Sequence, residues 1–154
     1  MKNMKMAEAQ VLKTPARINV CMELKCKLPV DIKKAVRVVA AGEKKKTGMI
    51  NFIFTGNKGI KKINLEYRMK NIETDVISFE TAGDGLISGD VYISVEKAKT
   101  DAKSNGISFA EEITWLVMHG LLHIAGYDHK NSKDENTMLS KQRKYVKNMI
   151  KEKV

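Results

Sequence analysis

The chain has 154 residues and a formal net charge of +10 at pH 7, with 28 Lys and Arg against 18 Asp and Glu. A chain of this length is expected to form one domain, residues 1–154, that buries a core without disulfides. No apolar run is long enough to span a bilayer, and Met1 to Lys13 is too polar for a secretory signal, so we expect a cytoplasmic protein. The charge favours a polyanionic partner such as nucleic acid, although a solvated basic surface has the same composition.

The first predicted element is a strand at residues 17–26, where apolar and polar residues alternate. Its apolar face would carry Ile18, Val20, Met22, Leu24 and Cys26. Cys21 and Cys26 are five positions apart and would point to opposite faces of a strand, so we expect both thiols to stay reduced and unpaired. Their spacing is too loose for a zinc knuckle, which leaves histidines as the expected metal ligands.

The middle of the chain alternates predicted helices and strands. A helix is predicted to open at Pro29 or Asp31 and to end at Gly42, because its apolar residues recur at helical spacing. The elements predicted after it are a strand at 49–55, a helix at 58–69, a strand at 75–79 and a strand at 90–95. The connection at residues 80–89 contains three glycines, and it is interpreted either as a plain hairpin loop or as a mobile rim of a cleft.

The C-terminal half is predicted to be helical. A helix at residues 95–104 is followed by Ser108 and Glu111, a capping box that begins a second helix, and a basic helix extends from about Ser132. Gly120, in the second helix, costs about 1 kcal/mol relative to alanine, which indicates a backbone or a substrate passing close to it. The second helix is apolar on nearly every side and is therefore predicted to be buried, with Ile113, Trp115, Leu116, Val117, Met118, Leu121, Leu122 and Ile124.

All three histidines of the chain lie near the end of this helix, in the segment H-G-L-L-H-I-A-G-Y-D-H at residues 119–129. His119 and His123 are four residues apart, so on a helix they share one face, with Cβ atoms about 5 to 6 Å apart. Gly126 can end the helix in a left-handed conformation and turn His129 back toward them. Three imidazoles without a fourth protein ligand would leave one open position on a metal ion for water.

A single histidine is more often a satisfied core or surface residue than a metal ligand. In a buried helix, however, each imidazole needs a hydrogen-bonding or metal partner, because an unpaired buried polar group costs about 1 to 3 kcal/mol. One ion bound by His119, His123 and His129 would meet this need for the histidines together. The segment therefore predicts a single metal site made of these three side chains.

The pattern H-x-x-x-H-x-x-G-x-x-H is shared with the metzincin proteases, whose general-base glutamate follows the first histidine. Gly120 occupies that place here, so a metzincin-type peptidase is not expected. The whole segment instead resembles the signature of the YbeY family, the bacterial rRNA-maturation endoribonucleases. Three more segments resemble motifs of this family, in the family's order: Asn64-Leu65-Glu66-Tyr67-Arg68, Thr74-Asp75-Val76-Ile77-Ser78-Phe79 and Gly89-Asp90-Val91-Tyr92-Ile93-Ser94.

This resemblance extends from about residue 60 to residue 138. It implies an α+β, zincin-like fold in which helices flank a mixed four-stranded sheet and a metal site lies at the C-terminal end of a buried helix. It also implies one zinc ion on His119, His123 and His129, a functional arginine at Arg68, and metal-dependent cleavage of single-stranded RNA. The implied partners are ribosomal RNA and ribosomal particles, and the implied roles are 16S rRNA 3′ end maturation and ribosome quality control.

Two other functions stay open as alternatives. The first is a non-catalytic, ribosome-associated RNA-binding protein with a structural zinc ion, which a three-histidine site disfavours because structural zinc normally has four protein ligands. The second is a metal-dependent hydrolase of another substrate. The proton acceptor is also open, between Asp128, Asp90, the phosphate of the substrate and bulk water. Asp128 fits equally well as a partner that orients an imidazole N–H.

Overall fold

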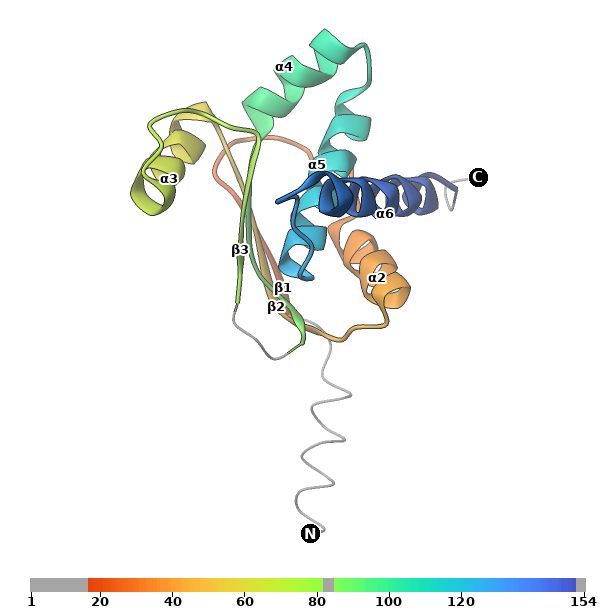
Figure 1. The fold of residues 1–154 in the computed structure, drawn as a ribbon. Coiled ribbons are helices and arrows are strands. Elements are labelled where there is room, and N and C mark those ends of the chain that lie inside the picture. Colours follow the sequence, from red (N-terminus) through yellow and green to blue (C-terminus); the bar gives the residue numbers. More distant parts are fainter. Residues whose placement is uncertain (1–16, 82–84, 152–154) are drawn as a thin grey trace.

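The structure, a computed structural model, describes residues 17–81 and 85–151 of the chain. The described residues form one sheet and five helices (Figure 1). In chain order the elements are β1 (Arg17–Met22), α2 (Ile32–Glu43), β2 (Thr47–Thr55), α3 (Asn57–Arg68), β3 (Val76–Glu80), β4 (Ile87–Ser94), α4 (Val95–Asn105), α5 (Phe109–Ile124) and α6 (Ser132–Lys151).

The sheet is mixed, with strand order β1-β2-β4-β3. The first three strands are parallel, and β3 pairs with β4 in the antiparallel direction as an edge strand. Helices α2, α5 and α6 lie on one side of the sheet and α3 on the other (Figure 1). The predicted α+β class, with helices around a mixed four-stranded sheet, is confirmed.

The core lies between the sheet and α5. Inward-facing residues of β2 and β4 are almost completely buried, as are most residues of α5, as the sequence predicted for this helix. Gly120 allows a close approach, because a Cβ atom there would lie 2.4 Å from Cγ1 of Val91 on β4. The neighbour of Gly120 is therefore a strand side chain, which corrects the expectation of a backbone or a substrate at this position.

Helix α2 begins where the sequence predicted and ends later. The Asp31 side chain accepts a hydrogen bond from the backbone N–H of Lys34 and caps the helix. Gly42 lies inside the helix, and Lys44 adopts the left-handed conformation that closes it. The prediction that Gly42 ends α2 was wrong because its small size serves tertiary packing: a Cβ there would lie 2.3 Å from Cε1 of Tyr145.

Strand β1 is shorter than predicted. The backbone N–H of Glu23 still donates to the carbonyl of Phe54, at 2.9 Å, and the chain then bends away from the sheet, so Leu24 and Cys26 lie beyond the strand. Val20 is 44% exposed because β1 is an edge strand that its neighbours cover only in part. Both cysteines are free, as predicted.

The connection between β3 and β4 is a hairpin, since Glu80 pairs with Gly89 across the two antiparallel strands. The strands extend into both ends of the predicted loop. Residues 82–84 lie outside the described part of the chain. The alternative interpretation of this connection as a mobile rim of a cleft concerns these residues and stays a prediction. The other element boundaries differ from the predicted ones by a few residues at most.

Helix α5 has the two ends that the sequence predicted. At its start the hydroxyl of Ser108 accepts a hydrogen bond from the backbone N–H of Glu111, at 3.1 Å. At its end Gly126 has a φ of +107°, and the backbone N–H of Tyr127 donates to the carbonyl of Leu122, at 3.0 Å. This turn directs the chain after α5 back along the helix. No helix among the described residues is long and apolar enough to cross a membrane.

Candidate metal centre

His119 and His123 project from the last two turns of α5 toward a common point. Their Nε2 atoms are 3.1 Å apart, and their ring centroids are 4.7 Å apart. Both side chains are half-buried. The spacing of four residues on a helix therefore places two imidazole nitrogens side by side, as the sequence analysis expected.

His129 joins them from the loop that follows α5. Its ring centroid lies 5.9 Å from that of His119 and 5.1 Å from that of His123, and its side chain is exposed. One nitrogen from each of the three rings lies within 4.8 Å of the others. The group could hold a metal ion.

Protein groups occupy the Nδ1 atoms of the two helical histidines. Nδ1 of His123 donates to the backbone carbonyl of Tyr127, at 3.0 Å, which requires the proton on Nδ1. Nδ1 of His119 lies 3.2 Å from Oε1 of Gln142, a completely buried side chain whose Nε2 donates to the carbonyl of Trp115. This second bond turns Oε1 toward His119, so Nδ1 of His119 also carries the proton. Both Nε2 atoms then have a free lone pair directed at the common point.

The electrostatic surroundings keep these two imidazoles neutral. Burial lowers the pKa of His119 despite its hydrogen bond to Gln142. Burial, followed by the neighbouring His119 and His129, lowers the pKa of His123 to about 4. A transition-metal ion binds the neutral form of histidine, so at neutral pH neither ring has to lose a proton first. Three nitrogen donors, two of them preoriented and neutral, fit a zinc ion.

The three histidines face a cleft of about 570 Å³, the histidine cleft. Its walls are the edge strand β3, the segment before this strand and the loop after α5. The residues that line it are Arg68, Thr74, Asp75, Val76, Ser78, Glu80, His119, His123, Gly126, Tyr127, Asp128 and His129. Arg68 and the three histidines, which lie up to 61 positions apart in the sequence, therefore share one cavity.

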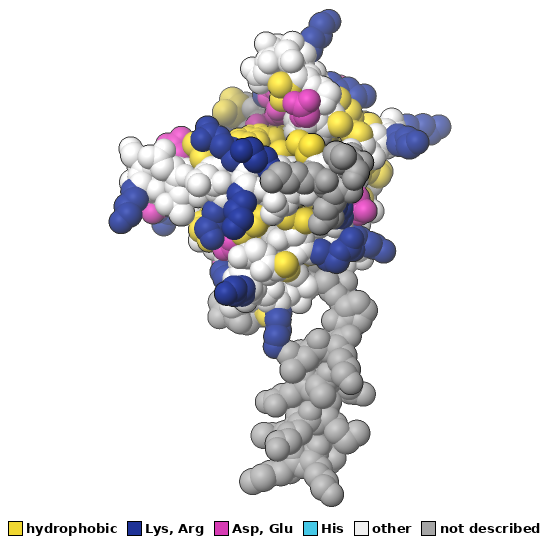
Figure 2. All heavy atoms as spheres, turned by 90° about the vertical axis from the view of Figure 1, so that its right-hand side faces the viewer, with side chains coloured by type: hydrophobic (Ala, Val, Ile, Leu, Met, Phe, Trp, Pro, Cys, Tyr) yellow, Lys and Arg dark blue, Asp and Glu magenta, His cyan; other side chains and the backbone are white. Residues whose placement is uncertain are grey.

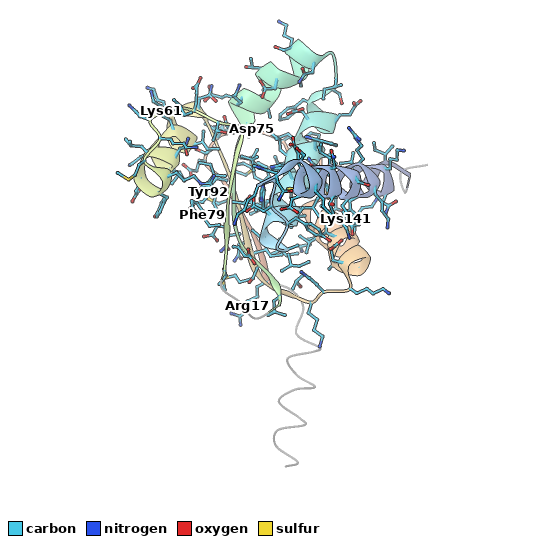
Figure 3. The ribbon with its side chains drawn as sticks, viewed as in Figure 1. Arg17, Lys61, Asp75, Phe79, Tyr92 and Lys141 are labelled. Atoms are coloured by element: carbon cyan, nitrogen blue, oxygen red, sulfur yellow. The ribbon has the colours of Figure 1, made fainter. Side chains whose placement is uncertain are left out.

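Arg68 reaches the cleft from α3, which lies on the other side of the sheet. Its Nη2 donates to the backbone carbonyl of Ser78 on the edge strand, at 3.2 Å, and its guanidinium lies 5.7 Å from the centroid of the Phe79 ring. Phe79 also makes edge-to-face contacts with Tyr67 and Tyr92. Figure 3 shows Phe79 and Tyr92 on the α3 side of the sheet. The aromatic group and the strand carbonyl thus hold the guanidinium at the rim of the cleft.

Comparison with known proteins identifies the family. The profile described as "Endoribonuclease YbeY" matches residues 21–150, most of the chain. The chain belongs to the YbeY family. The resemblance that the motifs indicated is therefore confirmed.

Relatives from distant bacteria agree with this membership. The protein named Endoribonuclease YbeY from Flavobacterium johnsoniae is 40% identical over 104 residues, which cover 68% of this chain and 75% of the relative. The protein of the same name from Carboxydothermus hydrogenoformans is 39% identical over 106 residues, covering 68% and 74%. The solution structure of TM1509 from Thermotoga maritima superposes with a TM-score of 0.68 at 29% identity, covering 88% of this chain and 90% of that one.

The structure separates the two aspartates considered as proton acceptors in this YbeY-family chain. Asp128 lines the histidine cleft, and its Oδ1 accepts a hydrogen bond from the backbone N–H of His129, at 2.7 Å, rather than from an imidazole. Asp90 is absent from the described lining of the cleft, and its Oδ1 accepts a bond from the side-chain amide of Asn51, at 2.9 Å. Asp128 is thus the only one of the two in the cleft.

Sequence reasoning did not single out Gln142, which contacts His119, or Ser78, which lines the histidine cleft. Gln142 lies 23 positions beyond His119 on α6, and no local motif connects the two. Ser78 has a buried hydroxyl oxygen without a hydrogen-bond partner among the described residues, and it lies beside Gly120, where a Cβ atom would be 3.3 Å from it. The only available signal was the serine in the Thr74 to Phe79 segment, and a serine in a strand is too common to single out.

A second group of potential ligands lies nearer the start of α5. Oxygen atoms of Asp75, Asp101 and Glu112 lie within 4.8 Å of one another. Asp101 forms an ion pair with Lys97, at 3.2 Å, and Asp75 accepts a bond from the backbone N–H of Val76, at 2.8 Å. These contacts give two of the three carboxylates a partner within the protein. Asp75, Asp101 and Glu112 lie too far apart in the sequence for a local pattern to group them.

Proposed function

We propose that this chain is a zinc-dependent endoribonuclease that cleaves single-stranded RNA. The observation that carries the proposal is the histidine cleft, where three imidazole nitrogens and a guanidinium meet in one cavity. The names of its relatives supply the substrate class, because the family and both bacterial relatives are called endoribonucleases.

His119, His123 and His129 would hold the zinc ion. A zinc ion on three neutral ligands keeps its full double positive charge, and when bound it supplies an activated water or polarises a phosphoryl oxygen. Gln142 and the carbonyl of Tyr127 fix the rings of His119 and His123, so the protein does not have to reorganise these ligands for each turnover. The open side of the three histidines faces the cleft, where an RNA strand would lie.

Arg68 would bind the phosphate of the scissile bond. The guanidinium is planar and carries five N–H donors, of which the carbonyl of Ser78 takes one. The others can bind two phosphate oxygens at once and stabilise the negative charge that develops during attack on phosphorus. Asp128 would accept a proton from the attacking group, with the phosphate of the substrate and bulk water as the other acceptors. Asp90 is not proposed as an acceptor because it does not line the histidine cleft as described.

The basic surface supports an RNA substrate. Figure 2 shows the face on the α2 and α6 side of the molecule, which carries many more Lys and Arg than Asp and Glu side chains. Phosphate groups that bind such a surface release counterions, so RNA affinity should fall steeply with salt. By family membership we propose ribosomal RNA and ribosomal particles as the natural partners, with roles in 16S rRNA 3′ end maturation and ribosome quality control in the cytoplasm.

The test is cleavage of a single-stranded RNA oligonucleotide by protein of measured metal content. The wild type should contain about one zinc ion per chain and cleave the RNA, whereas His123→Ala, purified in the same way, should lose both zinc and cleavage. Because contaminating nucleases would be present in both preparations, equal cleavage by the two would refute the proposal. Zinc content unchanged by His123→Ala would refute the ligand assignment.

Arg68→Ala tests the contribution of the guanidinium to cleavage separately from that of the metal ion. This variant should keep its zinc and its fold and lose about 100- to 1000-fold in cleavage rate, the usual effect of deleting one donor to a developing charge. Tyr67→Phe, a change at the neighbouring position that leaves the charge unaltered, is the control. Equal rates for Arg68→Ala and the wild type would remove Arg68 from the mechanism.

A further inference from the structure

The three histidines are held in different ways. His119 and His123 stand on a buried helix, and each has a hydrogen-bond partner at Nδ1. His129 stands on the loop between α5 and α6, its side chain is exposed, and it is its backbone N–H that donates a hydrogen bond, to Oδ1 of Asp128. The position of the third nitrogen therefore depends on what holds this loop in place.

Tyr127, two residues before His129, anchors the loop at both its backbone and its side chain. Its carbonyl accepts a hydrogen bond from Nδ1 of His123, and its backbone N–H donates to the carbonyl of Leu122. Its hydroxyl donates to Oε1 of Glu43, the last residue of α2. A link between residues 84 positions apart thus ties α2 to the loop that carries His129.

Other side chains fix the position of the Glu43 carboxylate that accepts this hydrogen bond. Its side chain is only 4% exposed, and its other oxygen accepts hydrogen bonds from the hydroxyl of Tyr145 and, at 3.0 Å, from Nζ of Lys141. Figure 3 shows Lys141 on α6, on the side of the sheet where α5 lies. Three donors from two different segments therefore converge on one buried carboxylate, which we call the Glu43 clamp: Glu43, Tyr127, Lys141 and Tyr145.

Two further contacts connect this region to the loop that carries His129. Nζ of Lys141 lies 5.2 Å from the centroid of the Tyr127 ring, so the ring is covered on that side by a cation that also binds Glu43. Nζ of Lys45, just after α2, donates to the carbonyl of Ala125 at the end of α5, at 2.6 Å. The end of α2 thus contacts the turn between His123 and His129 at two points.

We propose that Glu43 is a positioning residue of the metal site, which holds the Tyr127 loop so that His129 meets the nitrogens of His119 and His123. The inference rests on the proposed function for the identity of the ion. Glu43 acts through Tyr127 by two routes: the loop backbone that places His129, and the carbonyl that orients His123. A clamp that merely joined α2 to α6 would need Tyr145 and Lys141 but not Tyr127.

The two tyrosines provide a matched pair of variants. Tyr127→Phe and Tyr145→Phe each remove one hydroxyl that donates to the same carboxylate, and only Tyr127 lies between two histidines. Zinc dissociation constants are measured by competition with a chelator. Tyr127→Phe and Glu43→Gln should weaken zinc binding about 10- to 100-fold, the usual effect of losing a group that orients a ligand, and Tyr145→Phe less than about threefold.

A cobalt(II) spectrum is the second readout, because its visible absorption reports the geometry of the ligands. Tyr127→Phe should change the spectrum of the cobalt-loaded protein, and Tyr145→Phe should leave it as in the wild type. Urea unfolding of the metal-free proteins checks that the two variants lose similar stability.

The outcomes separate this inference from the proposed function. A wild type that binds zinc, with equal affinities in Tyr127→Phe and Tyr145→Phe, overturns the role of Glu43 and leaves the proposed function intact. The role of Glu43 is also overturned if the zinc affinity of each variant falls only in proportion to its loss of unfolding free energy. A wild type that binds no zinc overturns both.

Discussion

Glu43 and Glu112 are two glutamates with little-exposed side chains near opposite ends of α5, and their surroundings shift their pKa values in opposite directions. Burial alone would raise the pKa of Glu43, but hydrogen bonds from Tyr127, Tyr145 and Lys141 outweigh it and lower the pKa below its ordinary value. The ionised form of Glu43 is thus the form that the folded protein stabilises.

Glu112 has the opposite environment. It is 7% exposed, and burial followed by the negative charges of Asp101 and Asp75 raises its pKa. No hydrogen bond to its carboxylate is found within the described residues. Ionised Glu112 therefore costs stability. Burial of a carboxylate therefore does not decide whether its ionised form stabilises the protein. The number of hydrogen-bond donors around the carboxylate decides it, and in this protein these donors surround Glu43, at the histidine end of α5.

Removing the Glu43 carboxylate should have the largest effect on stability. Glu43→Ala leaves two tyrosine hydroxyls and the ammonium of Lys141 without their shared acceptor, so we expect a loss of about 3 kcal/mol in the free energy of unfolding. Urea unfolding of the metal-free protein measures it. Glu66→Ala, which removes an exposed glutamate on α3, is the control and should change stability by less than about 0.5 kcal/mol. Equal effects of the two substitutions would contradict the clamp.

The histidine end can also be weakened through Gln142. Gln142→Leu removes the acceptor at Nδ1 of His119 and the side-chain amide that donates to the carbonyl of Trp115, so zinc affinity should fall about 10- to 100-fold. Gln142→Glu keeps an oxygen for His119 and loses the bond to Trp115. It should therefore bind zinc more tightly than Gln142→Leu while remaining less stable than the wild type. Identical zinc affinities in both variants would show that Gln142 does not orient His119.

Glu43 and Gln142 also show which contacts a local sequence pattern cannot predict. The histidine segment was readable because its geometry is local: a helical spacing of four residues and a glycine turn bring the rings together. Ser108, Asp31 and the strand pattern of β2 were readable for the same reason. Glu43 contacts Tyr127 in the loop after α5, 84 positions away, and Gln142 contacts His119, 23 positions away. No short pattern encodes contacts between segments so far apart in the sequence.

One error in the predicted elements has the same origin. Gly42 has the features of a helix end, and a contact with Tyr145, more than 100 positions away, is what requires a glycine there. The alternation that predicted β1 continues to Cys26, but the strand ends at Met22 because the chain bends at Glu23 and Leu24. At Gly42 a tertiary contact thus overrides the local preference.

Between its two ends α5 touches the sheet at Gly120, and a side chain at this position should destabilise the protein. Gly120→Ala gains about 1 kcal/mol of helix propensity, but its Cβ would lie 2.4 Å from Cγ1 of the fully buried Val91. Overpacking costs about 1 to 3 kcal/mol, so we expect a net loss of about 1 kcal/mol in urea unfolding. Val91→Ala should relieve the clash, and a double-mutant cycle should give a coupling energy of at least about 1 kcal/mol. Additive effects would contradict the contact.

Glu112→Gln should have an effect of the opposite sign, because it removes the unfavourable charge at the other end of the helix. The glutamine amide is neutral at every pH and can donate to the carboxylates of Asp75 or Asp101, so at pH 7 we expect a gain of about 1 kcal/mol in the free energy of unfolding. Glu111→Gln, at the exposed neighbouring position, changes the charge equally and should not stabilise the protein.

The pH dependence of stability decides whether Glu112 is the cause. Because the pKa of Glu112 is higher in the folded protein than in the unfolded chain, the folded state binds this proton more tightly. Its contribution to stability is then complete below the unfolded pKa of about 4.5 and is lost as the pH rises through the folded pKa. Glu43 behaves in the reverse way: its contribution is present above about pH 4.5 and is lost as the pH falls through its lowered pKa. Glu112→Gln should therefore match the wild type near pH 4 and exceed it at pH 7, and a gain of the same size at both pH values would mean that the ionised carboxylate is not what costs stability.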